Sequence, residues 1–242
     1  MSNDVTSTTS ARKQLMRRDA IARRHTVGDA ERAEAGETLA EPATTLLPDQ
    51  TTNSNVDPAR AFAVDLNQAT DGRQRRQHIR REIPEDTAAA YISMGSEVPT
   101  IPLLEYLHKH ERRVLVPRLG SGCDIGWSEY DGREDLRSMP RTATGGIRPQ
   151  EPSGRTLAAQ AIEDASIVYV PAFAIDLDGN RLGRGGGWYD RALRLCRPDA
   201  VKIGVCWDWE LIDAHEAVPH ETHDIPVDAV ATPERFLWLR RQ

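Results

Sequence analysis

An alternation of short apolar runs with helix-like segments, beginning after Pro84, does most to limit the folds open to this chain. Runs of strand length occur at 88–93, 113–117, 125–130, 166–171, 201–207 and 227–231. Segments 97–110 and 192–196 have helical patterns, the first with leucines spaced for one face. Strands that alternate with helices in this way form a largely parallel sheet covered on both faces. The sequence therefore predicts a single Rossmann-like, three-layer α/β domain.

The first 84 residues have a different character. Residues 11–34 predict a helix, because apolar residues recur among charged ones, and Gly28 is expected to weaken this helix without ending it. Residues 1–10 are expected to form a flexible terminus. The polar composition of 36–58 predicts a disordered insert, and 58–82 predicts a second helix. The domain is thus expected to span 11–242, interrupted by the insert.

Composition argues against several classes of protein. A net charge of -6 over 242 residues is unlike that of a general nucleic-acid binder. No stretch approaches the roughly 20 apolar residues of a membrane span, and the polar N-terminus lacks the apolar region of a signal peptide. Cys123, Cys196 and Cys206 lack metal-binding spacing and are typical of free thiols. We expect a cytoplasmic protein that binds neither nucleic acid nor membrane.

A glycine-rich run after the 166–171 strand is the strongest candidate for a binding site. Residues 180–191 read Asn-Arg-Leu-Gly-Arg-Gly-Gly-Gly-Trp-Tyr-Asp-Arg, with four glycines and three arginines. Glycines let backbone N–H groups approach an anion, and arginines add fixed positive charge. The run matches neither G-x-G-x-x-G nor the P-loop. It lies where ligands bind in such sheets, beyond the carboxyl ends of the strands, although a plain flexible turn is the alternative.

Separated motifs in a fixed order then identify a family. They are Lys13-x-x-Met16-Arg17 with Arg24, the 91–100 run Tyr-Ile-Ser-Met-Gly-Ser-Glu-Val-Pro-Thr, Glu151-Pro152, the 170–176 run leading into 179–191, and the 223–228 run His-Asp-Ile-Pro-Val-Asp. Together they resemble the 5-formyltetrahydrofolate cyclo-ligase (5,10-methenyltetrahydrofolate synthetase) family over most of 11–235. The resemblance implies a NagB/RpiA/CoA-transferase-like form of the α/β fold.

The resemblance also implies an activity and partners. Members close 5-formyltetrahydrofolate to 5,10-methenyltetrahydrofolate with ATP and Mg2+, releasing ADP and phosphate. The formyl oxygen is first phosphorylated, because it is otherwise a poor leaving group, and N10 of the folate then attacks. Phosphoryl transfer of this kind depends on positioning and charge neutralisation. We expect a monomer whose partners are 5-formyltetrahydrofolate and ATP.

Residue roles follow from the same resemblance. The nucleotide contacts are expected at Lys13, Arg17, Arg181, Gly183, Arg184, Gly185, Gly186, Gly187, Trp188 and Tyr189. The expected substrate contacts are Ile92, Glu97, Arg184 and Trp188. Arg184 and Lys13 are the expected catalytic residues, and Asp190 and Asp224 are the expected magnesium ligands.

Each of these residues also has a structural interpretation. Lys13 and Arg17 fit a solvated helix face, Glu97 or Asp190 a carboxylate at a helix start, and Asp224 a turn carboxylate.

Two residues depart from the family pattern. Trp188 replaces the usual tyrosine, which removes a hydroxyl, and Gly186 replaces a cation seen in some relatives. A zinc site at His220, His223 and Asp224 is disfavoured because the spacing is not a common zinc pattern.

Two other functions stay open on the sequence. One is a non-catalytic formyl-folate binding or regulatory protein on the same fold, which the loss of the hydroxyl at Trp188 allows. The other is an enzyme similar to phosphosugar isomerases or CoA-transferases, for which the sequence offers no identifiable nucleophilic glutamate or sugar base.

Overall fold

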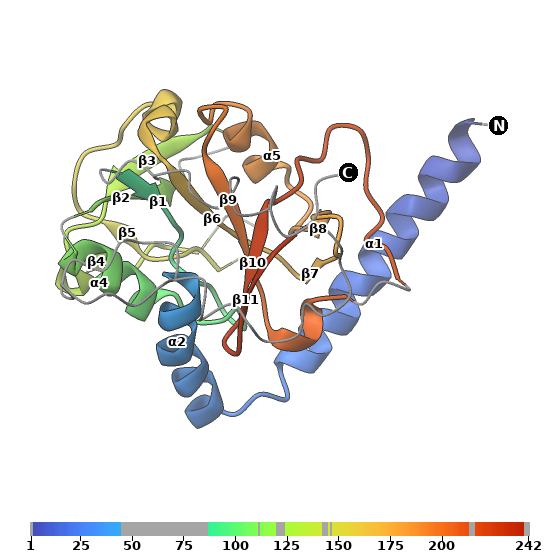
Figure 1. Ribbon diagram of the computed structural model, residues 1–242, viewed down its shortest axis with the longest axis horizontal. Coiled ribbons are helices and arrows are strands. Elements are labelled where there is room, and N and C mark those ends of the chain that lie inside the picture. Colours follow the sequence, from blue (N-terminus) through green and yellow to red (C-terminus); the bar gives the residue numbers. More distant parts are fainter. Residues whose placement is uncertain are drawn as a thin grey trace, which may run out of the picture.

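A seven-stranded sheet forms the centre of the computed structural model (Figure 1). The structure describes residues 2–44, 87–110, 112–119, 124–141, 145, 147–212 and 216–239. The strands lie in the order β11-β10-β9-β6-β1-β2-β3. Their bounds are β1 Thr87–Ala89, β2 Arg113–Arg118, β3 Gly126–Glu129, β6 Ile167–Pro171, β9 Val201–Val205, β10 Ala229–Ala231 and β11 Phe236–Trp238.

The sheet is mainly parallel, as the sequence predicts. Strands β10, β9, β6, β1 and β2 pair in parallel, and the edge strands β3 and β11 are antiparallel to their neighbours. β6 pairs with β9 from Ile167 opposite Val201 to Pro171 opposite Val205. Its run Ile-Val-Tyr-Val is fully buried, because β-branched and aromatic side chains pack well on both faces of a covered sheet.

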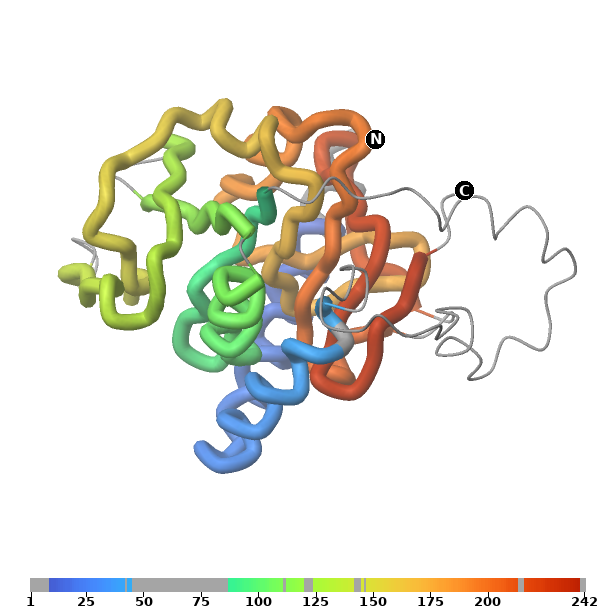
Figure 2. Tube along the Cα trace, turned by 60° about the vertical axis from the view of Figure 1, so that its left-hand side comes forward, coloured from blue at the N-terminus to red at the C-terminus, as the bar shows by residue number. Residues whose placement is uncertain are grey.

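Helices cover the two faces. On one face α2 (Asp29–Ala43) and α4 (Ile101–Lys109) pack side by side, as Figures 1 and 2 both show. Leu39 from α2 and Leu103, Leu104 and Leu107 from α4 are fully buried there. On the other face, Leu193 of α5 (Trp188–Leu193) and Ile162 of the 3-10 helix η3 (Ala159–Asp164) share a second core with Val168. The three-layer prediction is confirmed.

The N-terminal helices differ from the prediction. Instead of one helix over 11–34, α1 (Ser2–Arg24) ends before a turn and α2 begins at Asp29. The hydroxyl of Thr26 bonds the carbonyl of Arg23, and the Gly28 carbonyl accepts the first bond of the new helix. The prediction that Gly28 leaves the helix intact is therefore wrong. Residues 2–10 belong to α1, where a flexible terminus was expected.

The predicted insert is also partly wrong. Residues 36–43 continue α2, because Leu39 and Ala43 are buried and the Ala43 carbonyl accepts the Tyr169 hydroxyl. Gly36 lies against Pro99, where a Cβ would come within 2.8 Å of the proline ring. The rest of the insert and the predicted 58–82 helix lie outside the described residues.

Several short elements complete the domain. They are η2 (Arg133–Asp135), β4 (Leu136–Arg137), β5 (Glu151–Pro152), β7 (Ala174–Ile175), β8 (Arg181–Leu182) and η4 (Asp208–Glu210). The β7–β8 hairpin was not predicted. Strand β11 was not predicted either, because the 227–231 run was the final strand expected from the sequence. Helix α4 begins at Ile101 and not at 97, and α5 begins at Trp188 and not at 192.

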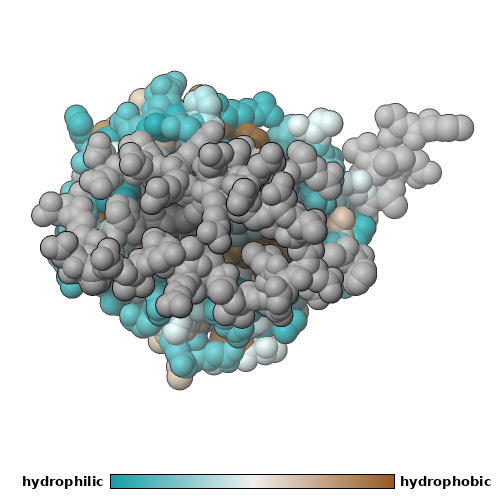
Figure 3. All heavy atoms as spheres, in the orientation of Figure 1, coloured by the Kyte–Doolittle hydropathy of each residue, from teal (hydrophilic) through white to brown (hydrophobic). Residues whose placement is uncertain are grey.

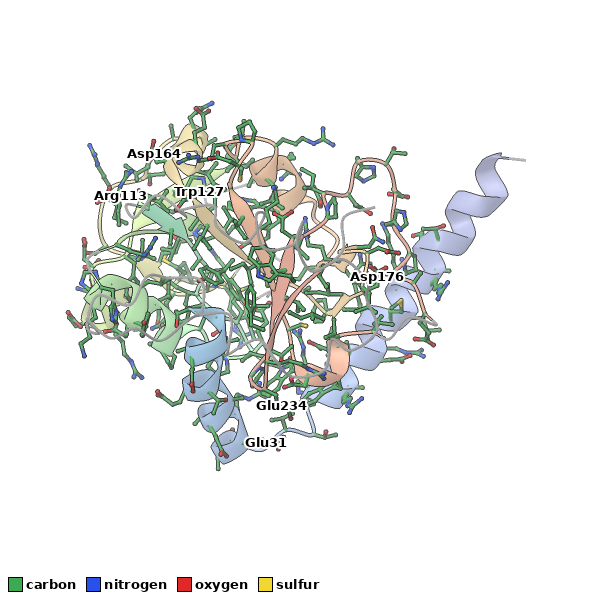
Figure 4. The ribbon with its side chains drawn as sticks, viewed as in Figure 1. Glu31, Arg113, Trp127, Asp164, Asp176 and Glu234 are labelled. Carbon is green, nitrogen blue, oxygen red and sulfur yellow. The ribbon has the colours of Figure 1, made fainter. Side chains whose placement is uncertain are left out.

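The coloured part of the face shown in Figure 3 is mostly hydrophilic, with apolar residues in small patches. No helix among the described residues is both long and apolar enough to cross a membrane. Surface ion pairs such as Arg113–Asp164, labelled in Figure 4, lie 2.8 Å apart on the outside of the fold.

Candidate active site

A cavity of about 490 Å³ opens beyond the carboxyl ends of the parallel strands β6, β1 and β2. Segments far apart in the sequence line it: α1, the chain after β1, the end of β2, the chain from β6 to α5, and the loop before β10. All of the predicted site residues line this one cavity: Lys13, Arg17, Ile92, Glu97, Arg181, Gly183, Arg184, Gly185, Gly186, Gly187, Trp188, Tyr189, Asp190 and Asp224. The fold thus brings together residues that the sequence keeps far apart.

Helix α1 supplies the first wall. Lys13 Nζ lies 2.9 Å from Asp224 Oδ2 and 3.7 Å from Glu221 Oε2. One turn further on, Arg17 Nε donates a hydrogen bond of 2.7 Å to the Gly183 carbonyl. Both side chains thus point into the domain, and the solvated-face interpretation is wrong for them.

The glycine loop supplies the second wall, and its backbone explains its composition. Gly185 has φ +96 and Gly187 has φ +61, a region that side chains with a Cβ rarely adopt. A Cβ on Gly185 would lie 3.4 Å from the Arg17 guanidinium carbon, so the cation packs directly on the loop backbone. The left-handed Gly187 caps α5 at its N-terminus, which places the positive end of the helix dipole beside the cavity.

Arg181 and Asp190 form a buried ion pair at the base of the loop. Arg181 Nη2 donates to Asp190 Oδ1 at 2.6 Å, and the same oxygen accepts the backbone N–H of Ile225 at 3.2 Å. Only 4% of the Arg181 side chain is exposed, and its Nε is buried without a partner among the described residues. A buried guanidinium with an unused donor favours an anionic ligand nearby.

Asp224 combines two interactions. Its Oδ2 accepts hydrogen bonds from the Lys13 ammonium and from the backbone N–H of Glu221. The second bond confirms the interpretation of Asp224 as a turn carboxylate. Partial burial acts to raise the pKa of this carboxyl, but hydrogen bonds from Lys13 and Glu221 and the charges of Lys13 and His223 together lower it. Asp224 is thus held as a carboxylate that faces a cation.

The segment after β1 forms a third wall, which holds residues that the sequence predicts as substrate contacts. Ile92 and Glu97 are buried, and Glu97 Oε1 accepts Arg184 Nη2 at 3.0 Å from the glycine loop. Glu97 Oε2 accepts the backbone N–H of Met94 at 2.8 Å. Glu97 does not cap α4, which begins four residues later at Ile101. The alternative interpretation of Glu97 as a helix cap is therefore wrong.

Trp188 closes one side of the cavity. Its ring packs edge-on against Trp127, with centroids 5.3 Å apart, and against Tyr189 at 4.9 Å. Its indole Nε1 donates to the Asp124 carbonyl at 3.4 Å. The indole N–H is therefore directed at the protein backbone.

Arg24 and Tyr91 are among the cavity residues that were not predicted. Arg24 pairs with the buried carboxylate of Glu210 through Nε at 2.6 Å and stacks on Phe173 at 4.4 Å. Tyr91 also lines the cavity, close enough to Glu97 and Arg24 for their charges to act on its hydroxyl. Both residues stand in the motifs that carry the resemblance, but their types alone did not distinguish a site residue from a core residue.

The two cysteines in the described part of the chain are free thiols, as predicted, with Cys206 buried and Cys196 half-buried. Burial raises the pKa of Cys196 to about 11 and that of Cys206 well above its ordinary value. Thiols protonated at neutral pH are poor nucleophiles. Cys123 lies outside the described residues. No group of three or more His, Cys, Asp or Glu side chains among the described residues is arranged to hold a metal, zinc included.

Known proteins similar to this chain identify its family. The sequence profile of the 5-formyltetrahydrofolate cyclo-ligase family matches residues 9–233. The 5-formyltetrahydrofolate cyclo-ligase of Mycolicibacterium smegmatis is 38% identical over 163 residues, which are 64% of this chain and 77% of that protein. The enzyme of the same name from Escherichia coli K12 is 31% identical over 155 residues, 63% of this chain and 80% of that protein.

Solved structures show the same fold. The 5,10-methenyltetrahydrofolate synthetase of Aquifex aeolicus superposes with a TM-score of 0.62 at 23% identity, covering 95% of this chain and 94% of that one. The 5,10-methenyltetrahydrofolate synthetase of Mycoplasma pneumoniae superposes with a TM-score of 0.58 at 15% sequence identity, covering 91% of this chain and 98% of that one. The profile match over most of the sequence and the identity of the relatives settle the family. This chain belongs to the 5-formyltetrahydrofolate cyclo-ligase family, a family of folate ligases.

Proposed function

We propose that the chain converts 5-formyltetrahydrofolate to 5,10-methenyltetrahydrofolate with hydrolysis of ATP, through a phosphorylated formyl intermediate. The observation that carries the proposal is the meeting, in one cavity, of a cationic wall and a wall with a buried carboxylate. The first suits the phosphates of ATP, and the second suits a ring that carries N–H donors. Family membership supports the same pairing of substrates.

The cationic wall has groups for the phosphoryl step. Lys13, Arg17 and Arg181 lie around the glycine loop, where the N-terminus of α5 adds its dipole. Arg184, with half of its side chain exposed, is the cation that reaches toward Glu97 on the opposite wall. We assign to Arg184 and Lys13 the neutralisation of charge on the transferred phosphoryl group.

Asp190 and Asp224 fit a magnesium ion bound together with ATP. Both carboxylates line the cavity, and each now faces a cation, Arg181 or Lys13. Mg2+ commonly takes one or two carboxylates and completes its shell with waters and phosphate oxygens. Bound there, it would neutralise phosphate charge. Lys13 would then bind a phosphate in place of the Asp224 carboxylate, and Asp224 would bind the metal in place of the Lys13 ammonium.

The wall that carries Ile92 and Glu97 is assigned to the folate. Glu97 is suited to the N–H groups of the reduced pterin ring, and Ile92 and Trp188 offer apolar surface to it. Arg184 belongs to the glycine loop and bonds Glu97 in this structure, which supports assigning it contacts with both the pterin and the phosphates. That position suits a residue that brings the formyl oxygen to the γ-phosphate.

A spectrophotometric assay tests the proposal. Purified protein with 5-formyltetrahydrofolate, ATP and Mg2+ should produce the methenyl product and an equal amount of ADP, and omission of either substrate should stop both. Lys13→Ala should reduce turnover by at least about tenfold, while Lys109→Ala, at an exposed position on α4, should not. Absence of product at saturating substrates would refute the enzyme and leave the formyl-folate binding protein as the alternative.

Two further expectations rest on the sequence and are proposals here. The chain is proposed to work in the cytoplasm and as a monomer. Sedimentation of the purified protein at micromolar concentration tests the second, since a mass near twice the 27.0 kDa of one chain would contradict it.

A further inference from the structure

We propose that Tyr91 is an additional substrate-binding residue, whose hydroxyl donates a hydrogen bond to an acceptor on the reduced pterin ring. This inference rests on the proposed function, because it assumes that the wall around Glu97 receives the folate. Tyr91 had no role in the site that the family resemblance implies.

The hydroxyl groups of the buried tyrosines fall into two kinds. Tyr169 donates to the Ala43 carbonyl at 2.8 Å, and Tyr130 donates to the carboxylate of Glu105. The hydroxyl of Tyr91 has no hydrogen-bond partner within the described part of the chain, although only 5% of the residue is exposed. A buried polar group without a partner is costly and rare in native proteins. The missing partner is therefore expected among the ligands or waters of the site.

The position of Tyr91 gives that hydroxyl access to the cavity. Tyr91 lines it together with its neighbour Ile92 and with Glu97. The Tyr91 hydroxyl oxygen is not among the fully enclosed side-chain atoms that lack a partner in the described structure. Those atoms belong to Arg32, Arg112, Arg181, Trp209 and Trp238. Hydrogen bonds hold the backbone in place, since Thr100 Oγ1 bonds both the Tyr91 carbonyl and the Ser93 N–H. The ring is thus presented from a fixed support.

The groups around Tyr91 suit a ring edge that carries a hydrogen-bond acceptor next to hydrogen-bond donors. Burial, then the nearby Glu97 carboxylate, raise the pKa of Tyr91 well above its ordinary value, so the hydroxyl stays protonated and can donate. Glu97 accepts hydrogen bonds only. A donor beside an acceptor matches the lactam-like edge of a reduced pterin, where a carbonyl oxygen adjoins N–H groups. The indole of Trp188 does not supply this donor, because its N–H is directed at Asp124.

Tyr91→Phe removes the hydroxyl and little else, so it is the decisive variant. We expect the KM for the formyl-folate substrate to rise about five- to tenfold, with kcat and the KM for ATP within about twofold of wild type. The Kd for formyl-folate, measured by titration calorimetry without ATP, should rise by the same factor. The variant should fold normally, because it leaves no protein partner unpaired. Tyr169→Phe is the matched control and should leave both KM values and the Kd unchanged.

Each other outcome has a defined meaning. Unchanged KM and Kd in Tyr91→Phe would overturn the inference. So would a rise in the KM for ATP, which would place the hydroxyl at the nucleotide, or a loss of kcat alone, which would place it at the reacting formyl group. If the wild type binds folate without turnover, the proposed catalytic function fails, and the Kd comparison still decides the role of Tyr91. If it binds no folate, both proposals fail.

Discussion

Arg184 Nη2 and Glu97 Oε1 lie 3.0 Å apart and tie the glycine loop to the segment after β1 across the cavity. The two side chains are unequal partners, since half of Arg184 is exposed, whereas only 5% of the Glu97 side chain is exposed. The carboxylate is therefore a fixed acceptor, while the guanidinium has solvent on its other side. An incoming pterin N–H group would compete with Arg184 for Glu97 and release the arginine toward the phosphates.

Replacing Glu97 by Gln tests this arrangement. The substitution removes the negative charge but keeps the shape, so hydrogen bonds from Arg184 and from the substrate lose their charge-assisted character. We expect the KM for the formyl-folate substrate to rise about 10- to 100-fold. Glu37→Gln, on the exposed side of α2, is the control. A KM within about twofold of wild type would show that Glu97 does not contact the substrate.

The Lys13–Asp224 ion pair predicts an acid-sensitive contribution to stability. The pKa of Asp224 is lowered in the folded protein, so the pair contributes stability that is fully present above the unfolded pKa of 3.8. The contribution should disappear as pH falls through the lower, folded value. Urea unfolding of wild type and Asp224→Asn between pH 7 and pH 3 should show a difference that shrinks only at the acid end. A difference that grows on acidification would contradict the sign.

Adding a single methyl group at Gly179 is expected to lower the stability of the fold strongly. Its φ is +86, and a Cβ there would come within 2.3 Å of the Val227 carbonyl oxygen. The Val227 N–H also bonds the Gly179 carbonyl, so the β7–β8 hairpin and the loop that carries Asp224 would have to separate. Gly179→Ala should lower the free energy of unfolding by about 2–4 kcal/mol. Gly186→Ala, with no atom within 4 Å of its Cβ, should cost less than about 1 kcal/mol.

The buried Arg24–Glu210 pair predicts non-additive mutations. Arg24→Met leaves the Glu210 carboxylate buried beside Trp207, with only backbone support, and should cost about 3–5 kcal/mol. The double variant Arg24→Met, Glu210→Gln removes the uncompensated charge and should recover more than about 1 kcal/mol of that loss. Chemical denaturation measures both. If the double variant is no more stable than Arg24→Met, the loss comes from packing and not from charge.

Strands with continuous apolar runs were predictable, because their signal is local. The run at 201–207 contains β9, and the run at 113–117 contains most of β2. The glycine loop could also be predicted from the sequence, since its positive φ angles at Gly185 and Gly187 require glycine. The location of the cavity followed from the topology of a parallel sheet.

The missed features depend on tertiary contacts. Helix α2 extends through a polar sequence because Leu39 and Ala43 bury against the sheet, which composition does not reveal. The strand β11 has only three residues and is defined by its pairing with β10. The carboxylate of Asp176, labelled at the β7–β8 hairpin in Figure 4, accepts the N–H of Val218, 42 residues away. Such pairs follow from the assembled fold.

The ion pair of Lys13 with Asp224 joins residues that are 211 positions apart. At about 5–20 residues per second, a ribosome needs roughly 10 to 40 s to synthesise the chain between them. During that time Lys13 and Arg17 are cations on a growing chain that does not yet contain Asp224, and Lys13 lacks its carboxylate partner. The proposed site becomes complete only when residue 224 is made, so we expect ATP to bind only after nearly all of the domain has been synthesised and folded.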